Sequence, residues 1–394
     1  MATAIGQRQT HVIIFSRKCL FLDNPIAQGI LNLEVATLAS NPDFETYFTS
    51  HLWPTPPMIA AIPDAIKCNY IARGNLRQFI LQKWSERKTV IICGAVDQDL
   101  YVAASTKSFL IAAGWVAPEE NVRNYGIPAP TPRKMRAIIE IFANQTSWYY
   151  SCTFNSPVPT KVVSLCLSNT YTTTGDEKFM AAAFQGILKD GNNNPVIKQA
   201  LICYLMAAIA HDPDFREVQD WAVAPSSSTE PNEVMEGLKE YVRCMMNGRK
   251  PQPIFIRHTA TTKSRFDGPV RQQMNYCQKH FQTICVNDDM TYKGKLRGRV
   301  VCVLDDFLTN GNTFEALRNL LVACGVGKII FLSIGKFQSS GENCYTQKLF
   351  NIQGDVHTTN YTATYAGALQ HPVFFNDNAR RELIDLMGLA NCLQ

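Results

Sequence analysis

The chain has few charged residues and lacks several features that define other classes of protein. Asp, Glu, Lys and Arg make up 18% of its 394 residues, whereas 46% are hydrophobic, and this composition excludes a disordered chain. No apolar run approaches the roughly 20 residues that cross a bilayer. The N-terminal MATAIGQRQT lacks the apolar core of a signal peptide. These absences predict a globular protein of the cytoplasm with no membrane partner.

No Cys-x-x-Cys pair occurs among the thirteen cysteines, and this argues against a zinc site. Most of them, such as Cys93, Cys166, Cys203 and Cys302, fall within apolar runs. We therefore expect small core hydrophobes in a reducing compartment.

The net charge is only +5, and the basic residues gather in short stretches such as TPRKMR and KGKLRGR. Such stretches either bind nucleic acid or form the solvated side of a helix or loop. Nothing else in the sequence favours nucleic acid, so that partner stays open but unsupported.

The length exceeds one ordinary domain of about 150 residues and predicts two. The polar, proline-containing stretch at 153–161 is one candidate boundary, and GDEKF at 175–179 is another. The first separates residues 1–155 from residues 156–394, and we adopt this division. Apolar strand-like runs alternate with helix-like runs in both halves, which is typical of an α/β fold.

The N-terminal half is expected to be a Rossmann-like α/β domain. We interpret HVIIF and TVIICGA as buried strands and residues 23–70, approximately, as an inserted region. Three stretches are predicted to be helices: LRQFILQKW, TKSFLIAAGW and RKMRAIIEIFA.

The C-terminal half is expected to contain a parallel sheet with flanking helices. NPVIKQALICYLMAAIA is predicted to be an amphipathic helix and EVMEGLKEYVRCMM another. The predicted core strands lie in DWAVAPSSST, PIFIRHT, VVCVL and GKIIFLSIGK. The tail from Gln338 onward is either a hood over a binding site or packing for the N-terminal half.

The stretch VVCVLDDFLTNGNTFEALRNLL at 300–321 is the most informative. Val300 to Leu304 is apolar without alternation, as in a strand covered on both faces. Phe314 to Leu321 has apolar residues at helical spacing. The residues between them therefore lie at the carboxyl end of a strand, where open α/β sheets bind ligands.

The residues between strand and helix suit a phosphorylated sugar. Asp305 and Asp306 are good partners for hydroxyl groups or hydrated Mg²⁺. The following loop offers backbone amides and hydroxyls beside a helix N-terminus, which favours a phosphate group. Its residues are Thr309, Asn310, Gly311, Asn312 and Thr313. A phosphate at one end and a diol at the other describe a ribose 5-phosphate.

This stretch resembles the motif with which type I phosphoribosyltransferases bind phosphoribosyl pyrophosphate (PRPP). An apolar strand, two acidic residues and two variable residues precede Thr-x-Gly-x-Thr, matched here by Thr309, Gly311 and Thr313. The resemblance implies PRPP binding with Mg²⁺ held by Asp305 and Asp306 through water, and transfer of phosphoribosyl to a nitrogen nucleophile in nucleotide metabolism. The alternative is an Asp-Asp turn followed by a Thr helix cap.

The resemblance also implies groups that bind pyrophosphate. Small residues after the first core strand would let the backbone approach it, and basic residues of a long mobile loop would close over it. These residues are Ser226, Ser227 and Ser228, and Arg257, Lys263, Arg265 and Arg271. The serines are equally typical of a helix cap, and the basic residues of a solvated surface. Thr309 stands where purine-salvage members carry an aspartate, so the acceptor stays unidentified.

The N-terminal half weakly resembles the haloacid dehalogenase-like hydrolases, without their catalytic residues. Ser16, Arg17 and Lys18 occupy the place of the acidic residues after the first strand. Gly94 stands where that family binds phosphate through Thr or Ser, and PAPTP lacks the lysine. This implies a scaffolding domain that contributes a homo-oligomer or protein interface.

Two other functions stay open for the whole chain. One is a non-catalytic PRPP or nucleotide sensor that regulates a partner, and the other is an effector of a bacterial toxin or anti-phage system. Release of pyrophosphate distinguishes an enzyme from a sensor.

Overall fold

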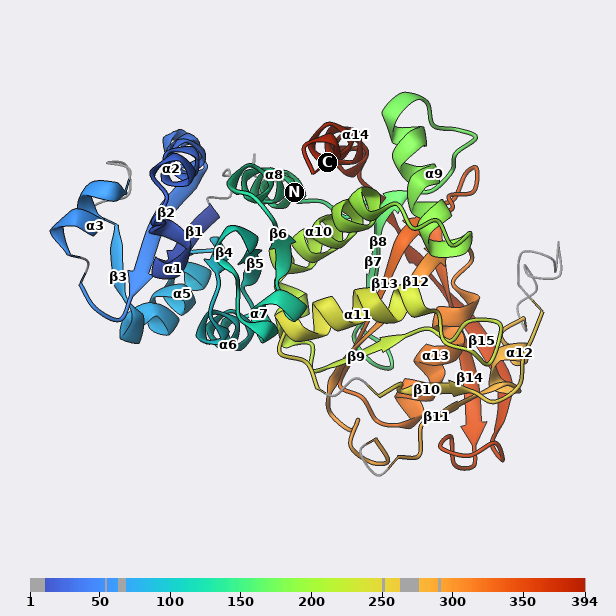
Figure 1. Ribbon diagram of the computed structural model, residues 1–394. Helices are drawn as coiled ribbons and strands as arrows, with labels where there is room; N and C mark the ends of the chain where they lie inside the picture. Colours follow the sequence, from blue (N-terminus) through green and yellow to red (C-terminus); the bar gives the residue numbers. More distant parts are fainter. Residues whose placement is uncertain are drawn as a thin grey trace.

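The computed structural model describes residues 11–53, 55–62, 69–249, 252–262, 276–289 and 292–393. The predicted α/β class is confirmed, because strands alternate with helices along the chain and form two six-stranded sheets (Figure 1). Two further antiparallel strand pairs lie beside the second sheet.

The first sheet is parallel throughout and has the order β3-β2-β1-β4-β5-β6. Its strands are β1 (His11–Ser16), β2 (Phe44–Ser50), β3 (Tyr70–Ala72), β4 (Thr89–Gly94), β5 (Phe109–Ala113) and β6 (Ile127–Ala129). Every residue of β1 is buried, as expected of a central strand with helices on both faces. The crossovers reverse direction between β1 and β4, which makes this a doubly wound sheet.

Successive residues of β1 pack on opposite faces of the sheet. Val12 and Ile14 lie in a cluster with α5 (Leu76–Ser85) and α6 (Asp97–Thr106). Ile13 and Phe15 lie in another cluster with α2 (Pro25–Ser40) and α8 (Pro132–Asn144). The shorter helices of this half are α1 (Arg17–Leu20), α3 (Pro56–Ala61) and α7 (Glu120–Tyr125).

Two predictions for this half are wrong. TKSFLIAAGW contains strand β5 instead of a helix, because five consecutive buried residues fill the space between β4 and β6. A short apolar run does not distinguish a buried strand from a buried helix. The described part of residues 23–70 is not an insertion, since α2, β2 and β3 belong to the sheet and its covering layer.

The second sheet has the order β16-β7-β8-β13-β12-β9. Four neighbours run parallel: β8 (Thr160–Leu167), β13 (Lys328–Lys336), β12 (Val300–Leu308) and β9 (Asp220–Val223). The antiparallel strands β7 (Tyr150–Phe154) and β16 (Phe374–Phe375) extend one edge. The second sheet therefore begins at residue 150, inside the N-terminal half of the predicted division.

Helices cover one face of this sheet, and α13 with the C-terminal hairpin covers the other (Figure 1). The first group is α9 (Gly175–Lys189), α10 (Pro195–His211), α11 (Glu233–Met245) and α14 (Asp377–Asn391). The second is α13 (Asn312–Ala323), α12 (Gln278–Phe281), β14 (Cys344–Gln353) and β15 (Thr362–Pro372). The hairpin β14-β15 packs on α13, at a distance from the first sheet.

The strand predicted in PIFIRHT exists but lies outside the large sheet. Strand β10 (Phe255–Arg257) pairs antiparallel with β11 (Ile284–Val286), and the two form a separate sheet. In the described part of the chain, β9 is thus the edge strand of the second sheet. The expectation of a fourth core strand at β10 is therefore wrong.

Helix α10 joins the two sheets. Every residue from Ala200 to Ala210 is buried, so the expected amphipathic pattern is wrong and the helix is apolar all round. It packs on α8 and β5 of the first half and on α9, α11 and α14 of the second. One apolar cluster consequently contains Ile13 of the first sheet and Leu304 of the second.

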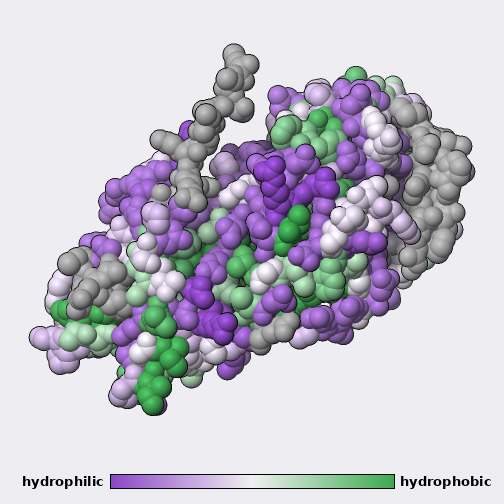
Figure 2. Space-filling model, turned by 90° about the horizontal axis from the view of Figure 1, so that it is seen from above, coloured by the Kyte–Doolittle hydropathy of each residue, from purple (hydrophilic) through white to green (hydrophobic). Residues whose placement is uncertain are grey.

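Most exposed side chains are hydrophilic on the face that carries α14 and α9, and smaller hydrophobic patches interrupt them (Figure 2). Within the described ranges, no helix combines the length and apolarity needed to cross a membrane. Cys93, Cys166, Cys203 and Cys302 are buried and free, which confirms their prediction as core residues.

We expect replacement of a leucine of α10 to destabilise the whole chain. Leu201→Ala removes a fully buried side chain from the cluster shared by both sheets and should lower the free energy of unfolding by about 2–5 kcal/mol. Chemical denaturation followed by circular dichroism measures this change. The control Leu33→Ala removes a side chain that is 66% exposed, and an equal loss in both variants would contradict the packing.

Candidate functional site

Three segments predicted to form a site meet at one edge of the second sheet. The amide of Ala224, just after β9, donates to the carbonyl of Leu304 at 2.8 Å. The serines at 226–228 therefore follow a strand end that lies beside Asp305. The loop at 309–313 follows β12 and leads into α13. The parallel register brings all three to the carboxyl edge.

The two aspartates lie within β12, which extends to Leu308 rather than ending before Asp305. Burial and the negative charge of Asp306 raise the pKa of the Asp305 carboxyl well above its usual value, although Lys189 acts in the opposite direction. The carboxylate of Asp306 pairs with Lys189 at the end of α9. A cation or hydroxyl donor between the carboxylates would relieve their mutual repulsion.

The loop after β12 presents unused backbone donors. The amides of Thr309, Asn310, Gly311 and Thr313 make no hydrogen bond to any residue in the described ranges. They lie at the positive end of the twelve-residue helix α13. This arrangement fits the predicted anion cradle, since such amides bind phosphate groups.

Gly311 is required by the shape of this loop. Its φ is +70°, in the left-handed region that favours glycine. A Cβ at this position would lie 2.6 Å from the ring of Tyr345 in β14. The C-terminal hairpin therefore sets the path of the loop by direct contact.

Two buried lysines hold the ends of the same loop. The ammonium group of Lys336, at the end of β13, donates to the carbonyl of Thr309 at 2.9 Å and pairs with Glu342 at 2.8 Å. The ammonium group of Lys348, in β14, lies 2.5 Å from the side-chain oxygen of Asn312. Their exposed fractions are 1% and 4%. The loop is thus tied to β13 at Thr309 and to β14 at Asn312.

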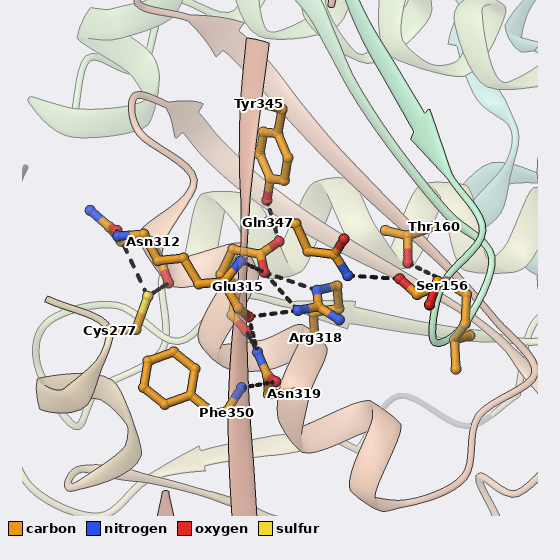
Figure 3. A network of polar contacts seen from close by, with 12 residues as sticks. Ser156, Thr160, Cys277, Asn312, Glu315, Arg318, Asn319, Tyr345, Gln347 and Phe350 are labelled. Carbon is orange, nitrogen blue, oxygen red and sulfur yellow. Dashed lines mark hydrogen bonds and ion pairs between the residues drawn. The ribbon is translucent and has the colours of Figure 1, made fainter. Parts of the chain in front are cut away.

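Beneath the loop, α13 is joined to the hairpin by a buried polar network (Figure 3). Glu315 accepts hydrogen bonds from the hydroxyl of Tyr345 at 2.8 Å and from the amide of Lys348 at 2.8 Å, and it pairs with Arg318 at 2.8 Å. The side chain of Asn319 donates to the carbonyl of Lys348 at 2.9 Å. Because its members are buried and paired, the network fixes the hairpin on the helix.

Arg257 contacts the backbone of residues 226–228, which we call the serine segment. Arg257 is 6% exposed, and its guanidinium group donates to the carbonyl of Ser226 and, at 2.6 Å, to the hydroxyl of Thr283. Burial lowers the pKa of Arg257 to about 10, so the group is charged at neutral pH. The amide of Thr261 donates to the carbonyl of Ser227 at 2.8 Å. Arg257 therefore supports the backbone of the serine segment.

The remaining predicted residues divide into two groups. Ser228 lies in the serine segment, where its hydroxyl is 2.9 Å from that of Ser226. Lys263, Arg265 and Arg271 lie outside the described residues.

Sequence reasoning missed four residues that shape the site: Lys189, Lys336, Tyr345 and Lys348. Lys336 ends an apolar strand, and a basic residue at a strand end was a usable signal. The other three have no local signal, because their contacts with β12 and α13 depend on packing between segments that are distant in sequence.

The corresponding edge of the first sheet is filled by the chain itself. The carboxylate of Asp99 accepts hydrogen bonds from the amides of Ala95 and Val96 at 2.9 and 3.1 Å and pairs with Arg73 at 2.5 Å. A Cβ at Gly94 would lie 2.5 Å from the Cβ of Asp99. An internal carboxylate thus uses the amides that could bind an anion before α6.

Comparisons with protein-family models, with curated proteins and with solved structures find no match to this chain.

We expect Asp305→Asn to stabilise the ligand-free protein, increasingly as the pH rises. The raised pKa means that the folded state binds more protons than the unfolded state above the unfolded pKa of about 3.9. Stability is therefore lost as the pH rises from that value through the folded pKa, and the amide removes this loss.

Thermal unfolding of parent and variant between pH 3 and pH 8 measures the difference. It should be smallest at pH 3, where the aspartate is protonated in both states. The exposed control Asp23→Asn should change stability little. A destabilised Asp305→Asn at pH 8 would show that the carboxylate is favoured in the folded chain.

Proposed function

We propose that this chain binds PRPP with Mg²⁺ and transfers its phosphoribosyl group to a nitrogen nucleophile, releasing pyrophosphate. The observation that carries the proposal is the loop at 309–313. It presents unused amides at the start of α13 and directly follows a strand that bears two interacting carboxylates. An anion cradle next to acceptors for a diol matches a ribose 5-phosphate.

The order of the second sheet supports this assignment. The serine segment follows β9, and the 309–313 loop follows its parallel neighbour β12, so a ligand at this edge would lie between the two loops. In open α/β sheets, ligands bind at this carboxyl edge. We therefore assign the second sheet to the type I phosphoribosyltransferase fold.

The carboxylates suit a cation that arrives with its ligand. Among the described residues, no group of three or more His, Cys, Asp or Glu side chains is placed to hold a metal. Mg²⁺ is commonly held by one or two carboxylates together with substrate phosphates and water. Asp305 and Asp306 would hold it through water, and it would neutralise negative charge on the pyrophosphate.

The proposed reaction forms one bond and breaks another at ribose C1. The nitrogen nucleophile attacks C1 as the bond from C1 to the pyrophosphate oxygen breaks, and the electron pair leaves with pyrophosphate. A proton is lost from the nitrogen. Positive charge develops on the sugar, and Asp305 and Asp306 stabilise it while they orient the hydroxyls. The 309–313 loop fixes the 5-phosphate, and the serine segment supported by Arg257 lies where pyrophosphate departs.

We expect PRPP binding to depend on both aspartates. Calorimetric titration of PRPP with Mg²⁺ into the parent should show binding. Asp305→Asn/Asp306→Asn should bind at least about tenfold more weakly, since hydrogen bonds to charged groups are lost. The chain offers a matched control in Asp288→Asn/Asp289→Asn, an exposed adjacent pair outside the site.

Equal affinities in the parent and the first double variant would overturn the site assignment. Pyrophosphate release, measured with ammonia and with free nucleobases as acceptors, then tests turnover. Binding without release by any acceptor would favour the sensor that regulates a partner over the transferase.

A further inference from the structure

A basic side chain contacts one of the two carboxyl groups that would hold the metal. Lys189 is the last residue of α9, and its ammonium group forms an ion pair with a carboxylate oxygen of Asp306. Carboxylate oxygens accept an ammonium group and a hydrated Mg²⁺ ion alike. The ion pair therefore marks Asp306 as a position in this fold that favours a cation.

The charge of Lys189 acts on both aspartates. The amide of Asp306 donates to a carboxylate oxygen of Asp305 at 2.9 Å, and the amide of Phe307 donates to one of Asp306 at 2.7 Å. The other oxygen of Asp306 pairs with Lys189. Burial and the charge of Asp306 raise the pKa of the Asp305 carboxyl, and the charge of Lys189 acts against them. One ammonium group thus offsets part of the repulsion between the two carboxyl groups.

The contacts of Lys189 suit a cation that exchanges. Its side chain is 45% exposed, and ion pairs of exposed lysines contribute little to stability. Its ammonium group lies 5.4 Å from the centroid of the Phe307 ring and at the negative end of α9. Both features attract a cation. Lys189 can therefore leave Asp306 at low cost in free energy and stay close to the site.

We propose that Lys189 is an internal counter-ion of Asp305 and Asp306 that exchanges with Mg²⁺. The lysine competes with free Mg²⁺ for Asp306, and it moves away when the metal arrives with PRPP. Phosphate oxygens of PRPP add ligands that free Mg²⁺ lacks, so the competition favours the metal that comes with substrate. The inference rests on the proposed function, which assigns Mg²⁺ to these aspartates, and it adds a positioning residue from outside the sequence motif.

The test measures metal affinity without PRPP. Mn²⁺ is the probe, because it takes the same oxygen ligands as Mg²⁺, and electron paramagnetic resonance measures its free concentration. Lys189→Met keeps the apolar stem and should bind Mn²⁺ about fivefold more tightly than the parent, since the competing cation is removed. The control Lys178→Met removes an exposed lysine from the same helix and should leave the affinity unchanged.

Two further variants separate competition from a structural role. Lys189→Arg keeps the positive charge and should bind Mn²⁺ as weakly as the parent does. In an Asp306→Asn background, Lys189→Met should produce no gain, because the carboxylate for which the lysine competes is absent. A structural role for Lys189 would instead lower the Mn²⁺ affinity of Lys189→Met, and that result would overturn the proposal.

Three other outcomes would also overturn the exchange: equal Mn²⁺ affinity in the parent and Lys189→Met, no binding of Mn²⁺ by either, or an equal gain in Lys178→Met. The last would show a general effect of net charge. These measurements contain no PRPP, so they are distinct from the calorimetric test of the proposed function. The expected gain, together with a parent that binds no PRPP, would refute the transferase and leave the counter-ion role standing. PRPP binding by the parent without the gain would refute the exchange alone.

Discussion

The parallel hydrogen bonding of β9, β12 and β13 is the constraint on which the site depends. It places the carboxyl ends of β9 and β12 side by side, so segments about 80 residues apart in sequence, as with Ala224 and Leu304, meet at one edge. In an antiparallel arrangement the same loops would lie at opposite ends of the sheet. The location of the aspartates, the serines and the loop therefore follows from the order and the parallel direction of these strands.

At this edge of the sheet, a loop held by several contacts lies next to two carboxyl groups that repel each other. Lys336, Tyr345 and Lys348 contact the 309–313 loop. The hydrogen bonds around Glu315 join α13 to the β14-β15 hairpin. The carboxylate of Asp305, in contrast, is destabilised by burial and by Asp306. A rigid backbone that carries a destabilised charged group is common at functional positions.

The local parts of this arrangement were predictable from sequence, and the long-range parts were not. The unbroken apolar run before Asp305 and the spacing after Gly311 predicted a buried strand and a helix, and β12 and α13 confirm both. TKSFLIAAGW was misassigned because an apolar run of that length suits either element. Lys348 escaped prediction because its contact with Asn312 joins residues 36 positions apart, and one sequence contains no information on that pairing.

The all-round burial of α10 bears on how the chain can be divided and produced. Any cut that separates the first sheet from the second leaves one face of this helix without its partners, either α8 and β5 or α9, α11 and α14. An uncovered apolar face of that kind promotes aggregation. Each half expressed alone would therefore need a redesigned surface to remain in solution, and the intact chain is the natural unit for biochemistry.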